Sequence, residues 1–275
     1  MTKYQWLAVC AFFAATLLCV REILVLPDGK LHLHILDVGQ GSAALLITPT
    51  GRTILVDGGP DTTVLERLGE HLSLFQRTID LLVISHADLD HIGGIPDVLQ
   101  RYDVRRVLLN GEVRDSAPYA AVLREIRAHR IPVLLPDPAT DIDMSDGVLL
   151  DVIWPAGPAF EENASGNGTS LVVRVLCGSD SVLLPGDIEM PSEAGILRSG
   201  ADIRSDILIA AHHGSTTSSS TGFLLATEPS FIAISAGRGN AFGHPHAAVI
   251  NRYAVLNIQN KVTAEAGTLS WELCE

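Results

Sequence analysis

The sequence predicts an α/β fold in which two sheets are covered by outer helices, in one domain preceded by a hydrophobic helix. The chain has 275 residues, of which 47% are hydrophobic, so it can bury a large core. Only 5% are aromatic, so aliphatic side chains must fill most of that core, as is typical of sheet-rich α/β proteins. Short apolar runs that suit strands alternate with longer segments of helical spacing.

The first 26 residues form a separate hydrophobic segment. An uncharged run of 15 residues, Trp6 to Val20, ends at Arg21. At about 1.5 Å per residue this run covers roughly 22 Å, short of a hydrocarbon core of about 30 Å unless the following apolar residues extend it. We expect a membrane anchor at residues 1–26, with a cleaved signal peptide as the second interpretation and a buried helix as the third.

The location of the folded part depends on this segment. With the N-terminus in the cytoplasm, the domain of residues 27–275 would lie outside the membrane, in the periplasm. Cleavage of the segment would instead release a secreted domain. The charges flanking the apolar run are too few to decide the orientation.

The remaining chain alternates strands and helices. The nearly continuous apolar run 79–85 is expected to be a strand buried on both faces. Further strands are expected at 31–38, 43–48, 53–56, 104–109, 132–135, 148–154, 170–176, 181–184, 207–211 and 231–235, followed by two short strands at the end. Helices are expected at 62–75, 95–102, 118–128, 221–226 and 247–256.

The formal net charge of −13 argues against tight, sequence-independent binding of nucleic acid, which usually needs a basic face. Part of the acidity would belong to metal-binding carboxylates. The simpler interpretation of the rest is an acidic surface that keeps the protein soluble.

Four cysteines are present without a CxxC spacing, which argues against a zinc knuckle or a thioredoxin-like site. Cys10 and Cys19 lie in the apolar N-terminus. Cys177 suits a small core position, and a disulfide between Cys177 and Cys274 in an oxidising compartment stays open at this stage.

The strongest chemical signal is residues 85–94, SHADLDHIGG, directly after the buried apolar run. This segment offers four metal-ligating side chains within six residues: His86, Asp88, Asp90 and His91. A loop that leaves a strand end can turn several side chains towards one point on a rigid support. Imidazole and carboxylate without thiolate suit zinc, manganese or iron. The competing interpretation is a solvated loop rich in turn-forming aspartates.

HADLDHIGG resembles the HxHxDH loop of the metallo-β-lactamase superfamily, with Asp88 where the second histidine usually stands. Six further motifs resemble one branch of it, the extracytoplasmic C-terminal hydrolase domain of ComEC-type DNA-uptake proteins. They are DVGQGS (37–42), LVDGG (55–59), NGTSLVV (167–173), LPGDI (184–188), HHGS (212–215) and SAGRGNAFGHP (235–245). The resemblance runs from about residue 31 to the end and implies a four-layer αββα sandwich. It omits the multi-pass channel region of these proteins, so it implies no DNA transport by this chain.

The resemblance also implies two divalent metal ions, zinc or manganese. His86 and Asp88 would serve one ion, and Asp90 and His91 the other. Asp187 would bridge the two ions, so that Asp90, His91 and Asp187 form the catalytic core. Because Asp88 replaces an imidazole, zinc should bind less tightly than in relatives with the full motif, and manganese becomes the alternative.

Later motifs complete the expected site. One histidine of HHGS would supply a ligand; we favour His212, with His213 as the alternative. His244 of the GHP sequence corresponds to a late ligand or a substrate contact. Four residues are expected to contact substrate: Asn167, Ser215, Arg238 and Asn240. Two acidic residues are expected to support the ligand loop by hydrogen bonds: Asp37 and Asp57.

These expectations together predict a binuclear metal-dependent hydrolase, tethered to the membrane by its N-terminal segment. The predicted substrate is a phosphodiester, including single-stranded DNA, which would make the protein a phosphodiesterase or DNA nuclease. A small-substrate hydrolase acting on a phosphorylcholine ester or a lactone would use the same site. A non-catalytic DNA-uptake accessory protein is the third interpretation, and it predicts no bound metal.

Overall fold

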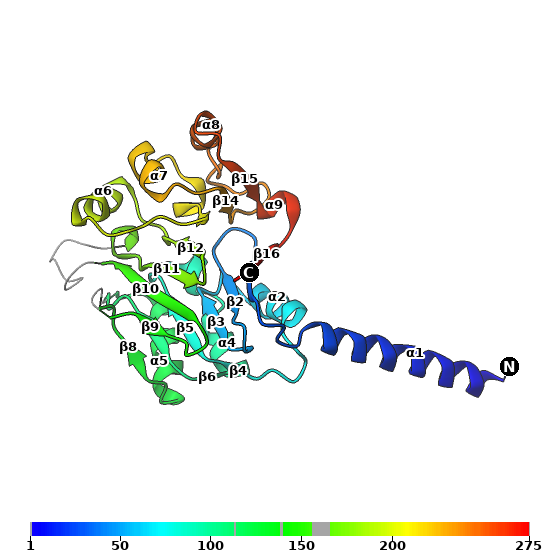
Figure 1. Cartoon of the computed structure of the whole chain (residues 1–275). Coiled ribbons are helices and arrows are strands. Elements are labelled where there is room, and N and C mark those ends of the chain that lie inside the picture. The colour runs from blue at the N-terminus through cyan, green and yellow to red at the C-terminus, as the bar shows by residue number, and fades with distance from the viewer. Residues whose placement is uncertain (1, 113, 138–139, 156–165, 275) are drawn as a thin grey trace.

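Two β-sheets pack face to face between outer helices, and one long helix projects from this body (Figure 1). The computed structural model describes residues 2–112, 114–137, 140–155 and 166–274. The layer order helix, sheet, sheet, helix confirms the predicted fold class. The two halves of the chain build one sheet each, apart from the last strand, which returns to the first sheet.

The first sheet begins with antiparallel strands and continues with parallel ones. Its order is β16 (Leu269–Leu273), β1 (Leu31–Ile35), β2 (Ala44–Ile47), β3 (Thr53–Val56), β5 (Leu81–Ile84), β7 (Val107–Leu109) and β8 (Val133–Leu134). All four residues of β5 are buried, because both faces of the sheet are covered, as its apolar sequence predicts. A small separate pair is formed by β4 (Thr78–Ile79) and β6 (Asp103–Val104).

The second sheet repeats this plan in the later half of the chain. Its order is β15 (Gln259–Val262), β14 (Phe231–Ile234), β13 (Ile207–Ile209), β12 (Asp180–Leu184), β11 (Val172–Cys177), β10 (Val148–Trp154) and β9 (Ile142–Asp143). The strands from β9 to β12 are antiparallel, and those from β12 to β15 are parallel.

Helices cover the outer faces of both sheets. Those of the first half are α2 (Thr63–His71), α3 (Leu89–Ile92), α4 (Ile95–Arg101) and α5 (Ala117–Ala128), and those of the second half are α6 (Met190–Ser199), α7 (Thr221–Thr227), α8 (Ala247–Val255) and α9 (Thr263–Ala266). Two single 3₁₀ turns are η1 (Gly166–Thr169) and η2 (Ala211–Gly214). The predicted helix 62–75 ends early, because Leu72 adopts extended backbone and its side chain is buried.

Three apolar clusters hold the layers together. The central cluster lies between the sheets and includes Leu33 and Val173, one from each half. The second cluster joins the first sheet to its helices, and the third joins the second sheet to helices through Phe223 and Tyr253. Each fully buried aliphatic side chain contributes about 1.5–3 kcal/mol, so these clusters fix how the two halves meet.

A disulfide also connects the two sheets. Cys177, at the end of β11, is bonded to Cys274, directly after β16, with Cα atoms 5.3 Å apart. Because β16 belongs to the first sheet and β11 to the second, the bond links the two halves. The sequence left open whether Cys177 and Cys274 form a disulfide, and the structure contains this bond.

The projecting helix is α1 (Lys3–Leu24), in which no residue is buried. It is long and apolar enough to cross a membrane, with a mean hydropathy of 2.1. The third interpretation, a helix buried in the domain, is therefore wrong. Its last turn contacts the domain: Arg21 donates to the carbonyl oxygens of Gly69 and Leu72, and Glu22 accepts from Ser73.

Candidate metal centre

Three strand ends and the loops that follow them meet at one edge of the two sheets. In the first sheet, the loop that contains His86 and His91 follows β5. In the second sheet, the parallel neighbours β12 and β13 are followed by Asp187 and His213. Because parallel strands end at the same edge of a sheet, side chains far apart in the sequence come together here.

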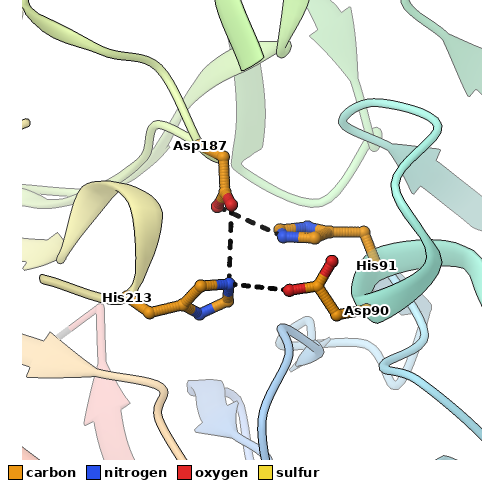
Figure 2. Close-up of side chains that lie close together, drawn as sticks. All are labelled: Asp90, His91, Asp187 and His213. Carbon is orange, nitrogen blue, oxygen red and sulfur yellow. Dashed lines mark hydrogen bonds and ion pairs between the residues drawn. The ribbon is translucent and has the colours of Figure 1, made fainter. Parts of the chain in front are cut away.

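Four side chains form a compact cluster: Asp90, His91, Asp187 and His213 (Figure 2). Their ligand atoms all lie within 4.8 Å of one another. Asp187 lies between both histidines, with Oδ1 3.2 Å from His91 Nε2 and Oδ2 3.4 Å from His213 Nε2. His213 Nε2 is also 3.2 Å from Asp90 Oδ2.

The orientation of the imidazoles fits a metal ion. His91 directs Nδ1 to Asp57 Oδ2 at 2.8 Å, and His213 directs Nδ1 to the carbonyl oxygen of Ser235 at 2.8 Å. These bonds leave the Nε2 atoms facing the cluster as lone-pair donors, the arrangement that metal-binding histidines use. Within the described residues, the buried Nε2 atoms of His86 and His91 have no hydrogen-bond partner of good geometry. A divalent cation would satisfy them.

The predicted ligands His86 and Asp88 lie beside this cluster. The imidazole rings of His86 and His91 have centroids 4.2 Å apart, and His86 Nε2 is 3.6 Å from Asp88 Oδ2. Asp88 also forms an ion pair with Arg114. The adjacent imidazole of His86 and the charge of Arg114 lower the pKa of Asp88 to about 2, so this carboxylate stays ionised.

The charges in the cluster are strongly coupled. Burial by itself lowers the pKa of a histidine, but Asp187 and Asp57 hold the pKa of His91 well above its usual value. Asp187 and Asp90 likewise outweigh burial and raise the pKa of His213 to about 9. Against its own burial, the two histidines hold the pKa of Asp187 well below its usual value. A metal ion that binds here would have to displace any protons from these two imidazoles.

Asp57 supports the ligand loop, in the role that the sequence suggests for it. Its carboxylate accepts hydrogen bonds from the backbone nitrogen and the hydroxyl of Ser85, at 2.8 and 2.7 Å, in addition to the one from His91. Asp57 is 2% exposed, so these three donors satisfy a carboxylate that burial would otherwise destabilise. The motif LVDGG therefore fixes the ring plane of His91.

Two glycines allow the HADLDHIGG segment to pack closely on its neighbours: Gly41 of DVGQGS faces it, and Gly93 within it faces the residue after LVDGG. A Cβ atom on Gly41, whose φ is +151°, would lie 2.3 Å from the carbonyl oxygen of Asp90. A Cβ atom on Gly93 would lie 1.9 Å from the carbonyl oxygen of Pro60. The DVGQGS loop therefore packs directly on the ligand loop, and Ser42 donates its backbone nitrogen to the Asp90 carbonyl at 3.0 Å.

The HHGS motif places its two histidines differently. Both have positive φ, 51° at His212 and 55° at His213, a region that costs most residues on the order of 1–3 kcal/mol. This backbone directs the ring of His213 into the cluster. His212, which the sequence favoured, lies at the edge, with Nε2 3.9 Å from Asp187 Oδ2 and Nδ1 3.4 Å from Glu189 Oε1.

His244 lies over the cluster without joining it. Its ring is stacked on that of His213, with centroids 6.0 Å apart, and its buried Nδ1 has no hydrogen-bond partner in the described part of the chain. Burial and the charges of His213 and His212 lower the pKa of His244 to about 4. The lone pair of a neutral imidazole at this place is available to bind a metal ion or to accept a hydrogen bond from a substrate.

The four residues expected to contact substrate lie in different environments, and one of them, Asn167, reaches the site. The amide nitrogen of Asn167 lies 3.4 Å from His212 Nδ1. Ser215 is buried, and its hydroxyl hydrogen-bonds to that of Thr217. Arg238 donates to the carbonyl oxygen of Ala264. Asn240 is occupied with its own loop, since it donates to the carbonyl oxygens of Gly237 and His244 and accepts from two backbone nitrogens.

Asp37 does not occupy the supporting place proposed for it. Its backbone bonds to Thr268 and Arg67, and its carboxylate accepts from Gly39 at 3.4 Å. None of the contacts of Asp37 within the described ranges reaches the ligand loop. The DVGQGS segment instead contacts the ligand loop through the backbone nitrogen of Ser42, which donates to the carbonyl oxygen of Asp90.

Sequence reasoning missed three residues at the site. Ser85 and Ser235 hydrogen-bond to histidines of the candidate site, and Arg114 contributes a positive charge next to Asp88. Ser85 had a local signal, because it directly precedes His86 at a strand end. Ser235 acts through its backbone carbonyl, and Arg114 lies outside every motif, so neither had a sequence signal.

Comparison with known proteins connects this site to a family. The family described as the metallo-beta-lactamase superfamily matches residues 36–229. Competence protein ComA of Neisseria gonorrhoeae is 31% identical over 251 residues, covering 90% of this chain and 33% of that protein. ComE operon protein 3 of Bacillus subtilis (strain 168) is 27% identical over 257 residues, covering 87% and 33%. The chain thus spans about a third of the length of these relatives.

A solved structure supports the same fold. The metallo-beta-lactamase fold protein YhfI from Bacillus subtilis superposes with a TM-score of 0.57 over 89% of this chain and 100% of that one. The sequence identity is 13%, so this likeness concerns the fold alone.

Proposed function

The chain belongs to the metallo-β-lactamase superfamily of metal-dependent hydrolases, and we propose that it is a phosphodiesterase that cleaves single-stranded DNA. One observation carries this proposal: buried imidazole nitrogens and carboxylates from both halves of the chain converge on one point, and their outer atoms are held by hydrogen bonds. The relative named Competence protein ComA, together with the resemblance to ComEC-type DNA-uptake proteins, supports DNA as the polymer.

We assign the ligands residue by residue. His86 and Asp88 would hold one divalent ion, zinc or manganese, and Asp90 and His91 the other. Asp187 would contact both ions, because its two carboxylate oxygens face different histidines. His213 would be the histidine ligand from HHGS, since its Nε2 lies within 3.4 Å of Asp187 whereas that of His212 lies 3.9 Å away.

Two bound divalent ions supply an activated water near neutral pH and neutralise charge on a phosphodiester. The chain's own residues prepare this chemistry. Asp57 and the Ser235 carbonyl fix the rings of His91 and His213, so no reorganisation is needed when substrate arrives. Arg114, half-exposed beside Asp88, is the cation placed to contact a phosphate oxygen at the rim.

We further propose that α1 is a retained anchor and that the domain lies outside the cytoplasm. Arg21 and Glu22 bond the end of α1 to backbone of the domain, so the helix continues directly into the folded part. The Cys177–Cys274 disulfide supports an oxidising compartment. Labelling of single introduced cysteines in intact cells tests this orientation. The cysteine of Val255→Cys should react with a membrane-impermeant thiol reagent, because Val255 is exposed. Failure of this cysteine to react in intact cells would exclude the orientation.

The test of the activity uses the full chain purified in detergent and loaded with Mn²⁺ or Zn²⁺. Metal content, cleavage of a labelled single-stranded oligonucleotide and cleavage of bis(p-nitrophenyl) phosphate are measured beside Asp187→Ala. We expect about two metal equivalents and cleavage of both substrates by the wild type alone. A metal-loaded wild type that cleaves a lactone or a phosphorylcholine ester but neither the oligonucleotide nor bis(p-nitrophenyl) phosphate would contradict the proposal.

A further inference from the structure

The loop between β14 and α8 carries an exposed aromatic residue, Phe242, whose ring stacks on that of His244 beside the cluster. Phe242 is 65% exposed. Single exposed apolar residues are common and need no function. Two features set Phe242 apart: the loop that holds it is fixed by hydrogen bonds, and its ring continues a stack that begins at the metal cluster.

The loop is fixed mainly by Asn240. The side-chain nitrogen of Asn240 donates to the carbonyl oxygen of Gly237 at 2.9 Å and to that of His244 at 2.6 Å. Its oxygen accepts from the backbone nitrogens of Phe242 and His244, at 3.2 and 3.0 Å. The backbone nitrogen of His246 donates to the Gly214 carbonyl, which ties the loop to the HHGS turn. Phe242 is therefore displayed on a constrained backbone.

Three rings follow one another from the cluster to the surface. The ring of His244 is nearly parallel to that of His213, at 25° with centroids 6.0 Å apart. The ring of Phe242 is nearly parallel to that of His244, at 22° with centroids 5.8 Å apart. His213 is 2% exposed, so the series leads from a buried residue of the cluster to an aromatic face in water.

We propose that Phe242, backed by His244, is the stacking platform for a nucleobase next to the scissile phosphodiester of a single strand. This inference rests on the proposed function and names what the enzyme recognises besides the phosphate. Aromatic side chains bind single strands with little sequence preference, because every base presents a π-face. Bases within a duplex are already stacked and cannot occupy the platform.

The charge of the protein favours this mode of recognition. With a net charge of −13, the chain cannot rely on general attraction to a polyanion. The cation of the same loop, Arg238, donates to the Ala264 carbonyl through both Nε and Nη2. Stacking on Phe242 is a source of affinity that does not depend on the phosphate charge.

The test compares two substrates of equal length: a single-stranded oligothymidylate and the same backbone with abasic residues. The full chain, loaded with Mn²⁺, should cleave the base-bearing strand with a kcat/KM roughly 5- to 140-fold higher. This range follows from about 1–3 kcal/mol per stacked base at about 1.4 kcal/mol per tenfold. Phe242→Ala should bring the ratio close to one, and Phe242→Trp should keep or increase it.

Phe75→Ala is the matched control, because Phe75 is 80% exposed and directly follows Ser73 and Leu74, which hydrogen-bond to Glu22 at the end of α1. It should leave the ratio unchanged.

The outcomes separate this inference from the proposed function. Equal cleavage of both strands by the wild type, or a base preference that Phe242→Ala leaves intact, overturns the platform while phosphodiester cleavage stands. Absence of cleavage of both strands and of bis(p-nitrophenyl) phosphate overturns the proposed function and the platform with it. An unchanged melting temperature of Phe242→Ala shows that a lost ratio does not come from unfolding.

Discussion

The two halves of the molecule contribute to the proposed metal centre in different ways. The first half would supply His86, Asp88, Asp90 and His91 from one loop after β5. The second half supplies Asp187 and His213 from two different strand ends. The first set is assembled by local backbone, and the second only by the pairing of β12 with β13. The comparison indicates that one loop of the first half gathers its proposed ligands locally. Packing of the second half against this loop adds the remaining ligands and completes the site.

The largest expected effect comes from removing Asp187, which contacts histidines of both halves within the cluster. Asp187→Ala removes the carboxylate that faces both His91 and His213 and leaves two buried imidazoles that repel each other when protonated. We expect loss of bound metal and a fall in kcat/KM well beyond the 10- to 100-fold that loss of a supporting hydrogen bond causes. Metal analysis and oligonucleotide cleavage measure it; two retained equivalents of metal would show that the halves bind independently.

The HHGS histidines provide the next test, with a matched control in the adjacent position. His213→Ala should greatly reduce metal affinity, because His213 belongs to the cluster. His212→Ala should have a smaller effect, because His212 lies at the edge of the site. Titration of the metal-free variants with Zn²⁺ measures both affinities. The reverse order would place His212 in the ligand shell and would require the turn to rearrange when metal binds.

Asp57→Asn tests the local support within the first half. An amide oxygen accepts fewer hydrogen bonds than a carboxylate, and the three donors from Ser85 and His91 cannot all be satisfied. We expect metal affinity or activity to fall by about 10- to 100-fold, with the fold retained. Circular dichroism provides the control for folding, and unchanged metal affinity would mean that the loop backbone alone orients His91.

The smallest expected effect on activity comes from the bond that links the two sheets. Replacing Cys177 and Cys274 by alanine should lower the free energy of unfolding by about 4–5 kcal/mol, since the bond spans 97 residues. Metal content of the folded protein should stay the same, because neither cysteine belongs to the cluster. Denaturant unfolding measures the stability. A loss of metal in the folded variant would show that the disulfide also sets the distance between the halves.

Much of the fold could be predicted from the sequence, because the apolar spacing that defines each element is local. The buried run at β5 and the turn-bounded strands of the first half are examples. The helix predicted at 62–75 is the instructive exception. It ends at His71 because Leu72 is extended and buried and its carbonyl accepts from Arg21, a contact 51 residues away.

The sequence by itself determined the chemistry of this protein. Imidazoles and carboxylates at 86–91, glycines where backbones touch, and an apolar N-terminal segment are fixed by residue type and spacing. Only the tertiary structure decided which histidine of HHGS faces Asp187, that DVGQGS supports the ligand loop through backbone, and that Phe242 stacks on His244. The physical reason is that ligand type is a property of a side chain, whereas direction depends on how two sheets pack.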